Sequence, residues 1–180
     1  MEALLGWLRD GNLRPTAKEI ADRAGISVRS VYVHFDDLED LFCAAAAHQM
    51  TDLVGLVHEI PATGLFEARL EAFVAQRGRV FERVMPVRRA ATLVEPFSPA
   101  LAQLLEATRF ARDEITRVFA AELEALPAEA RADTIRAADA LATAEAWDHL
   151  RRHAGCSAEQ AAAATTAGLR AILTSWSPPA

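Results

Sequence analysis

The chain has few of the residues that define several protein classes. Its two cysteines, Cys43 and Cys156, lie in distant segments, and two thiols cannot form the disulfide framework of a small secreted domain. We therefore expect a reducing, cytoplasmic location. No apolar run approaches the roughly 20 residues of a membrane-spanning helix, so no membrane partner is expected. The opening "MEALLGWLRDG" lacks the apolar segment of a secretion signal.

Basic residues are also scarce. The 180 residues hold 19 Lys and Arg against 25 Asp and Glu, and Lys18 is the one lysine. The formal net charge of −6 excludes a polyanion binder by overall composition, so any contact with nucleic acid must come from a local patch. Motifs for a nucleophile elbow, a phosphate loop or a dinucleotide fold are absent, so we expect neither an enzyme nor a cofactor.

No segment shows the alternating pattern of a β-strand. Hydrophobic residues make up 52% of the chain, which is ample for a core, and proline, glycine and capping residues divide it into helices. We predict an all-α protein of about nine helices. Pro86 is expected to interrupt one helix, and Pro127 to start another that runs to about Ala154. Ser157 is expected to cap the last helix, which ends near Trp176.

Residues 16–35 have the pattern of a helix-turn-helix motif. Thr16 and Glu19 have the spacing of a capping box, Gly25 suits the turn, and Ser27 can cap the second helix. The apolar residues expected on the inner face are Ile20, Ile26, Val31 and Phe35. Two short helices joined by a glycine turn are typical of DNA readers, although two ordinary helices with solvated polar faces would give the same pattern.

The second helix of this motif carries the candidate DNA contacts. The side chains assigned to them are Ser27, Val28, Arg29, Ser30, Tyr32 and His34. Serine hydroxyls can donate to phosphates or bases, Arg29 can read guanine, and Val28 can touch a thymine methyl. Tyr32 and His34 can bond phosphates. Val33 also points outward, without an assigned role.

The segment "PTAKEIADRAGISVRSVYVHFDDLEDLF", residues 15–42, resembles the N-terminal signature of the TetR/AcrR family of transcriptional regulators. Tyr32-x-His34-Phe35 after Ala24-Gly25-x-Ser27 carries the resemblance. It implies a three-helix DNA-binding domain over residues 1–48 and a helical ligand-binding and dimerisation domain over residues 49–180. It also implies a palindromic double-stranded operator, an unknown small-molecule effector and a homodimer. The DNA contacts that it implies are Thr16, Ser27, Arg29, Ser30, Tyr32 and His34.

The sequence departs from this family at positions that contact phosphate. The lysine that usually begins the fourth helix is Leu38 here, and residues 1–50 hold five Lys and Arg against eight Asp and Glu. Each missing cation weakens the sequence-independent part of DNA affinity. We therefore predict weaker DNA binding than is usual in the family. The basic arm that often precedes the first helix in this family is also absent here. A native chain that starts upstream of Met1 would restore it.

The last helices carry a candidate dimer interface. Small and apolar residues recur at helical spacing, and small residues allow close helix approach in a four-helix bundle of two chains. The residues assigned to the interface are Leu141, Ala144, Trp147, Thr165, Gly168, Leu169 and Ile172. The alternative is that these helices pack only within one chain.

A candidate effector pocket lies in the central helices. Aromatic residues with a few polar groups suit a mostly apolar ligand, although phenylalanines at this spacing are commonly core residues. The residues assigned to the pocket are Phe73, Arg77, Phe81, Arg88 and Phe110. Glu145, His149 and His153 follow one helix face near Cys156, but we predict no metal, because such stripes are commonly solvated.

These observations favour a ligand-responsive DNA-binding regulator, a repressor released from its operator by an effector. The alternative is a helical small-molecule-binding protein with weak or lost specific DNA binding.

Overall fold

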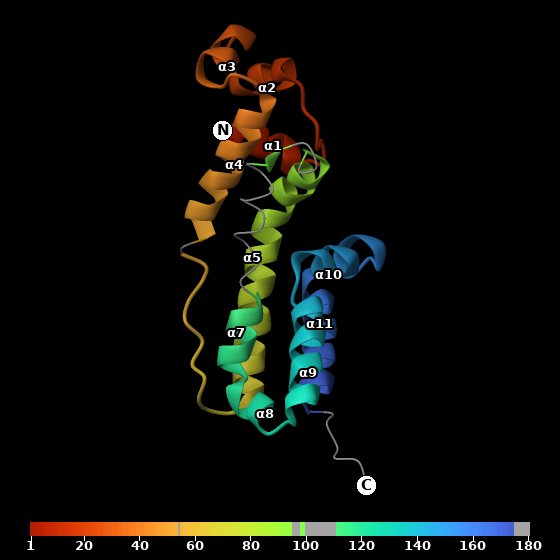
Figure 1. The fold of residues 1–180 in the computed structure, drawn as a ribbon. Coiled ribbons are helices and arrows are strands. Elements are labelled where there is room, and N and C mark those ends of the chain that lie inside the picture. The colour runs from red at the N-terminus through yellow and green to blue at the C-terminus, as the bar shows by residue number, and fades with distance from the viewer. Residues whose placement is uncertain (54, 95–97, 100–110, 175–180) are drawn as a thin grey trace. The chain divides into compact units, whose positions relative to one another are not determined.

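The computed structural model describes residues 1–53, 55–94, 98–99 and 111–174, and every regular element in those ranges is a helix (Figure 1). This confirms the predicted all-α fold. None of the helices in these ranges is long and apolar enough to cross a bilayer. The chain forms two compact units, one of residues 1–55 and 83–108 and the other of residues 56–82 and 109–180.

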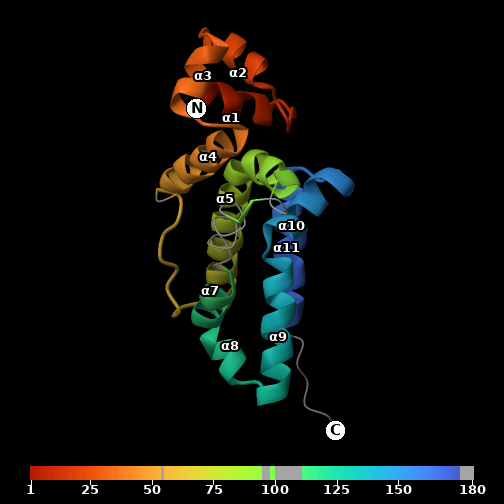
Figure 2. The same cartoon turned by 45° about the horizontal axis from the view of Figure 1, so that its top comes forward.

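The first unit contains α1 (Glu2–Arg9), α2 (Ala17–Ala24), α3 (Val28–His34) and α4 (Leu38–Leu53). Side chains of α1 hold α2 in place. The indole of Trp7 donates to the backbone carbonyl of Glu19 at 3.0 Å. The guanidinium of Arg23 lies over the Trp7 ring and pairs with Asp10 at 2.7 Å. In both views α2 and α3 form one end of this unit, and α4 runs away from them (Figures 1 and 2).

The ends of α2 and α3 have the predicted caps. The Thr16 hydroxyl accepts from the Glu19 backbone N–H at 3.2 Å, and the Glu19 carboxylate accepts from the Thr16 backbone N–H at 2.7 Å. Gly25 ends α2 with a left-handed φ of +68°, and the Ser27 hydroxyl caps α3 by accepting from Ser30. The helix-turn-helix geometry is therefore confirmed by local hydrogen bonds.

The contact between α2 and α3 is made by fewer side chains than the pattern predicted. Ile20, Ala21 and Val31 are buried in one cluster with residues of α1 and α4. Phe35 packs against that cluster but is only partly buried. Ile26 is 48% exposed, so its assignment to the inner face is wrong. It lies in the turn between the helices, where the periodicity of a helix does not apply.

The helix α5 (Phe66–Val94) is continuous through Pro86, contrary to the predicted interruption. Proline removes one backbone hydrogen bond, the one that residue 86 would donate to the carbonyl of residue 82. The buried side chains of Phe81, Met85 and Val87 hold both sides of that point in place. Residues 66–82 of α5 belong to the second unit, and residues 83–94 belong to the first.

The two units divide the chain differently from the predicted boundary at residue 48. Val87, Ala90 and Ala91 of α5 are buried in the same cluster as the helices of the first unit. Gln49 at the end of α4 donates to the Arg83 carbonyl at 2.8 Å. A segment far along the sequence therefore completes the core beneath the helix-turn-helix motif.

The second unit adds the C-terminal helices to residues 66–82 of α5. These helices are α7 (Ala111–Val118), α8 (Ala120–Glu124), α9 (Ala128–Leu141), α10 (Ala144–Asp148), the π-helix η2 (His149–His153) and α11 (Ala158–Thr174). Its core includes Phe73 and Phe119, whose rings meet edge to face at 5.5 Å. α9 and α11 lie side by side (Figure 2).

Helices of the second unit are interrupted inside one predicted long helix and again at Phe119. The helix expected from Pro127 to Ala154 ends at Leu141, because the Thr143 hydroxyl caps a new helix by accepting from Ala146 at 3.1 Å. A break at Phe119 separates α7 from α8, and there Arg69 of α5 donates to the Val118 carbonyl. The cap predicted at Ser157 is present, since its hydroxyl accepts from Gln160 at 3.1 Å.

Replacing Gly25 with Ala should lower the free energy of unfolding by about 1 kcal/mol, because a Cβ is strained at positive φ. A Cβ at Gly25 would meet no atom within 4 Å, so the cost comes from the backbone alone. Gly55→Ala is the matched control, with open space and no positive φ. Urea unfolding followed by circular dichroism measures both. Equal effects of the two substitutions would contradict this reading of the turn.

Candidate nucleic-acid interface

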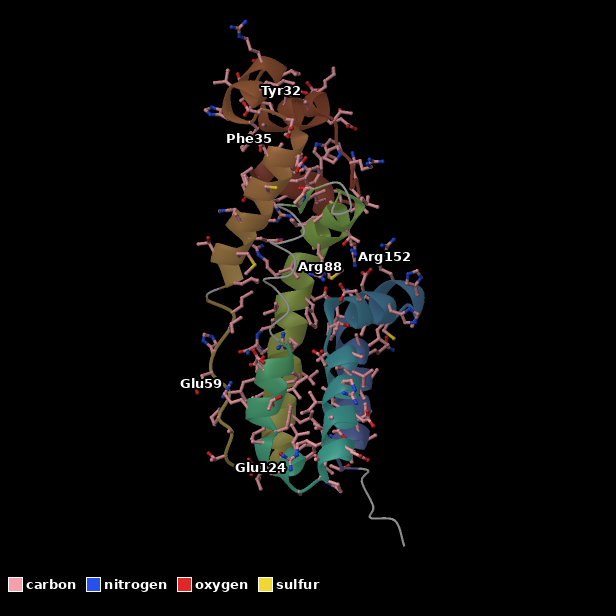
Figure 3. The ribbon with its side chains drawn as sticks, viewed as in Figure 1. Tyr32, Phe35, Glu59, Arg88, Glu124 and Arg152 are labelled. Carbon is pink, nitrogen blue, oxygen red and sulfur yellow. The ribbon has the colours of Figure 1, made fainter. Side chains whose placement is uncertain are left out.

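The outward face of α3 is the candidate reading surface. Val28 is 38% exposed, Tyr32 50% and Val33 70%, and the Arg29 side chain is also exposed. Val31, by contrast, is buried, so α3 has one face in the core and one in solvent. Figure 3 labels Tyr32 on this helix. Five of the seven predicted DNA contacts lie on α3, which brings them together.

The two serines at the start of α3 have a structural role as well. The Ser27 hydroxyl accepts from the Ser30 backbone N–H at 3.0 Å, and the two hydroxyl oxygens lie 2.8 Å apart. A hydroxyl that accepts a capping bond still has one proton to donate. The serine pair can therefore donate one further hydrogen bond without giving up the cap.

Thr16 lies apart from α3 in sequence, at the start of α2, where its side chain is exposed but engaged. Its hydroxyl donates to the Glu19 carboxylate at 2.8 Å besides accepting the capping bond. Hydrogen bonds from the Thr16 backbone and hydroxyl lower the pKa of Glu19. A phosphate contact by this hydroxyl would have to replace the bond to Glu19, which makes Thr16 the least available of the predicted contacts.

Most cations of the N-terminal helices are paired with neighbouring carboxylates. Their ion pairs are Arg9 with Glu2 at 3.3 Å, Lys18 with Asp22 at 2.6 Å and Arg23 with Asp10 at 2.7 Å. Among the described residues up to 53, Arg14 and Arg29 are the Lys or Arg side chains outside such pairs. The sequence already has few Lys and Arg in this region, and ion pairing leaves fewer still to neutralise phosphate.

Residues 11–45 match the model of the family named "Bacterial regulatory proteins, tetR family". This segment is similar to that of tetR-family regulators. The matched segment contains both helices of the helix-turn-helix motif, and with them every predicted DNA contact. The tetR-family match supports a DNA-binding transcriptional regulator.

The fold of the whole chain is similar to that of a solved structure. The crystal structure of a transcriptional regulator from Rhodococcus sp. Rha1 superposes with a TM-score of 0.68 at 22% sequence identity. The match covers 97% of this chain and 96% of that one. At this identity the likeness shows the fold alone. No curated protein sequence matches the chain.

The residues assigned to a dimer interface pack within one chain. Trp147 is 3% exposed, and its indole donates to the Glu82 carboxylate at 2.8 Å. A Cβ on Gly168 would lie 2.9 Å from Leu141, so these two residues meet across α9 and α11. The other assigned residues are buried or partly buried in the same unit, namely Ala144, Thr165, Leu169 and Ile172.

The buried members of this set, such as Trp147 and Leu169, have little surface left for a partner, whereas Leu141, Gly168 and Ile172 keep some exposed surface. A repeating apolar pattern predicts a buried face, but it does not tell whether the same chain or another covers it. The exposed alanines on the outer faces of α9 and α11 are Ala137, Ala140, Ala163, Ala164, Ala167 and Ala171. Dimerisation through this pair of helices stays a prediction, with that outer face as the available surface.

The residues assigned to the effector pocket are divided between the units. Phe73, Arg77 and Phe81 belong to the second unit, where Phe73 is buried in the core and Phe81 packs against Trp147 at 6.0 Å between ring centroids. Arg88 belongs to the first unit and is partly buried. Phe110 lies outside the described residues. The structure therefore places three of the five in one unit.

The histidine stripe has a geometry unlike that of a metal site. The rings of His149 and His153 stack with centroids 5.4 Å apart and an interplanar angle of 28°. Both lie in the π-helix η2, whose wider turn changes the spacing that an α-helix would give. Within the described part of the chain no three side chains of the metal-binding types converge.

DNA binding should show a shallow salt dependence, because few unpaired cations face solvent near α3. The slope of log K against log salt is about −0.9 for each phosphate neutralised, so a dimer should stay shallower than about −6. Fluorescence anisotropy with a selected site at several salt concentrations measures it. Leu38→Lys adds one cation to each protomer, so the slope should become steeper by about one for each half-site that the dimer binds. A wild-type slope steeper than −6 would contradict this prediction.

Proposed function

We propose that the protein is a dimeric transcriptional repressor that a small-molecule effector releases from its operator. The single observation that carries the DNA-binding part is the outward face of α3, which lies inside the tetR-family match. Its exposed Arg29 and Tyr32 stand on a helix whose opposite face is fixed by the burial of Val31. A rigid helix with exposed base-reading and phosphate-bonding groups suits a major groove.

A dimer would match the symmetry of a palindromic operator. The two copies of α3 would have to reach half-sites about 34 Å apart, one helical turn of DNA. The outer face of α9 and α11, with its exposed alanines, suits close packing against the same face of a second copy. The location proposed for the dimer is the cytoplasm, as for other DNA-bound regulators.

The effector-responsive part rests on a buried polar cluster in the second unit. Arg77 pairs with Glu114 at 2.7 Å and lies over the Phe73 ring at 5.2 Å. Gln76 donates to the same Glu114 carboxylate at 3.2 Å and accepts from the backbone N–H of His58 at 2.8 Å. Burial lowers the pKa of Arg77, the expected cost of removing a guanidinium from water.

Hydrogen bonding in this cluster is incomplete. The buried Nε–H of Arg77 has no acceptor among the described atoms. A buried ion pair adds little net stability, and an unmet donor costs free energy, so such clusters suit a role other than stability. We place the effector contact at this cluster, where a ligand acceptor would complete the bonding of Arg77.

Release from DNA would follow from a shift between two conformations. An effector that binds one conformation more tightly raises the population of that conformation. The operator binds the other conformation more tightly, so effector binding and DNA binding weaken each other. The alternative function is a helical small-molecule-binding protein without useful DNA affinity, and the scarcity of unpaired cations in the N-terminal helices is its support. An enzyme is not indicated by the tetR-family match.

Selection of bound sites from genomic DNA with the full-length protein tests the proposal. One palindromic site should be enriched, and Arg29→Ala should weaken its binding about tenfold or more, because a good guanine contact contributes about 1–3 kcal/mol of discrimination. Tyr32→Phe should weaken it to a smaller extent. Both variants should keep the wild-type melting temperature and sedimentation coefficient, since both side chains are exposed.

Arg152→Ala is the matched control, because it removes an exposed arginine of the second unit, outside the segment that matches the tetR family. It should bind the site with wild-type affinity. Full affinity in both the Arg29 and Tyr32 variants would mean that α3 is not the reading helix. Failure to enrich any site would favour the alternative function.

A further inference from the structure

The reading face of α3 is more apolar than the proposed function requires. At 100° per residue, Arg29 and Val33 are the two positions opposite the buried Val31. The centre of the outward face therefore holds one cation and one aliphatic side chain. Ser30 and Tyr32 flank them on the two sides.

Val33 is the most exposed of the large apolar side chains in the N-terminal helices, at 70%. A β-branched side chain in a helix has one strongly preferred rotamer, so it loses little conformational entropy when a partner covers it. Its shape is fixed before contact, and most of its surface is available to a partner. No hydrogen bond or charge of its own fixes its position, so any affinity from Val33 must come from apolar burial.

The position of Val33 beside Arg29 points to the chemistry of its partner. The two are one helical turn apart on the same face, so a pose that brings Arg29 to a guanine edge also brings Val33 to base edges rather than to phosphates. The apolar group that base pairs present in the major groove is the C5-methyl of thymine. Unpaired cations are scarce nearby, which leaves base contacts to provide more of the affinity.

We propose that Val33 is a specificity-determining residue that reads a thymine methyl in each half-site, an inference that rests on the proposed DNA-binding function. The geometry also places that thymine. Four residues of helix rise about 6 Å, and base pairs are spaced about 3.4 Å apart. The thymine therefore lies within about two base-pair steps of the guanine that Arg29 reads.

Replacing single thymines of the selected site with deoxyuridine tests this inference, because deoxyuridine lacks only the methyl. The full-length protein should lose about fourfold in affinity at one thymine per half-site, the effect of about one buried methyl. A loss at any other thymine, such as one that Val28 contacts, should be the same in the wild type and in Val33→Ser. Val33→Ser should bind the thymine and deoxyuridine sites equally, whereas Val57→Ser, at an exposed valine of the second unit, should keep the wild-type difference.

The results of these binding experiments distinguish the role of Val33 from the proposed DNA-binding function. A selected site that binds specifically but tolerates every deoxyuridine would overturn the role of Val33 and leave the regulator intact. The same holds if Val33→Ser keeps the wild-type discrimination. Loss of a dimer or higher oligomer in Val33→Ser by sedimentation would assign this face to a protein contact and also overturn the inference. Failure to select any site would remove the proposed function itself.

Discussion

The burial of Val31 against Ile20 and Ala21 is the constraint on which the reading surface depends. α3 has only seven residues and could not persist alone in water, so its direction is set by this contact and by the left-handed turn at Gly25. Once Val31 faces the core, the helical repeat places Arg29 and Val33 outward. The buried side of α3 thus determines which of its side chains face outward and can contact a partner.

The core beneath α3 is completed from a distant part of the sequence. Val87, Ala90 and Ala91 at the end of α5 are buried with the N-terminal helices, although α5 begins in the other compact unit. A single continuous helix therefore contributes to both cores. α5 therefore links one end of the helix covalently to the residues that support α3 at the other end. A continuous helix of this kind is an element that an allosteric regulator needs.

Most cations of the N-terminal helices are paired with carboxylates, and one of these pairs also ties two helices together. Arg23 is the clearest case, since it stacks on Trp7 and pairs with Asp10, where a free arginine could have bound phosphate. Exposed pairs of this kind contribute little to stability, roughly 0–1 kcal/mol each. Their larger effect is to cancel positive potential near α3, so that phosphate contacts would contribute less of the DNA affinity and base contacts more.

Local signals in the sequence predicted the first 50 residues well, because caps and turns are determined by neighbouring residues. The capping box of Thr16 and Glu19 and the turn at Gly25 needed no tertiary information. The predictions failed where distant contacts decide. Arg69 takes the Val118 carbonyl and breaks a helix, and α5 continues through Pro86 because packing on both sides compensates for one lost bond. The sequence pattern of α9 and α11 could not decide what covers their apolar side, since periodicity does not distinguish a neighbouring helix from a second chain.

In the proposed function, α3 reads bases from the major groove with the face opposite Val31. Protection from dimethyl sulfate tests it most directly, because the reagent methylates guanine N7 in the major groove and adenine N3 in the minor groove. The bound protein should protect one guanine N7 in each half-site, and Arg29→Ala, at a concentration that still saturates the site, should lose that protection alone. Protection confined to adenine N3, or guanine protection that Arg29→Ala leaves unchanged, would contradict the claim.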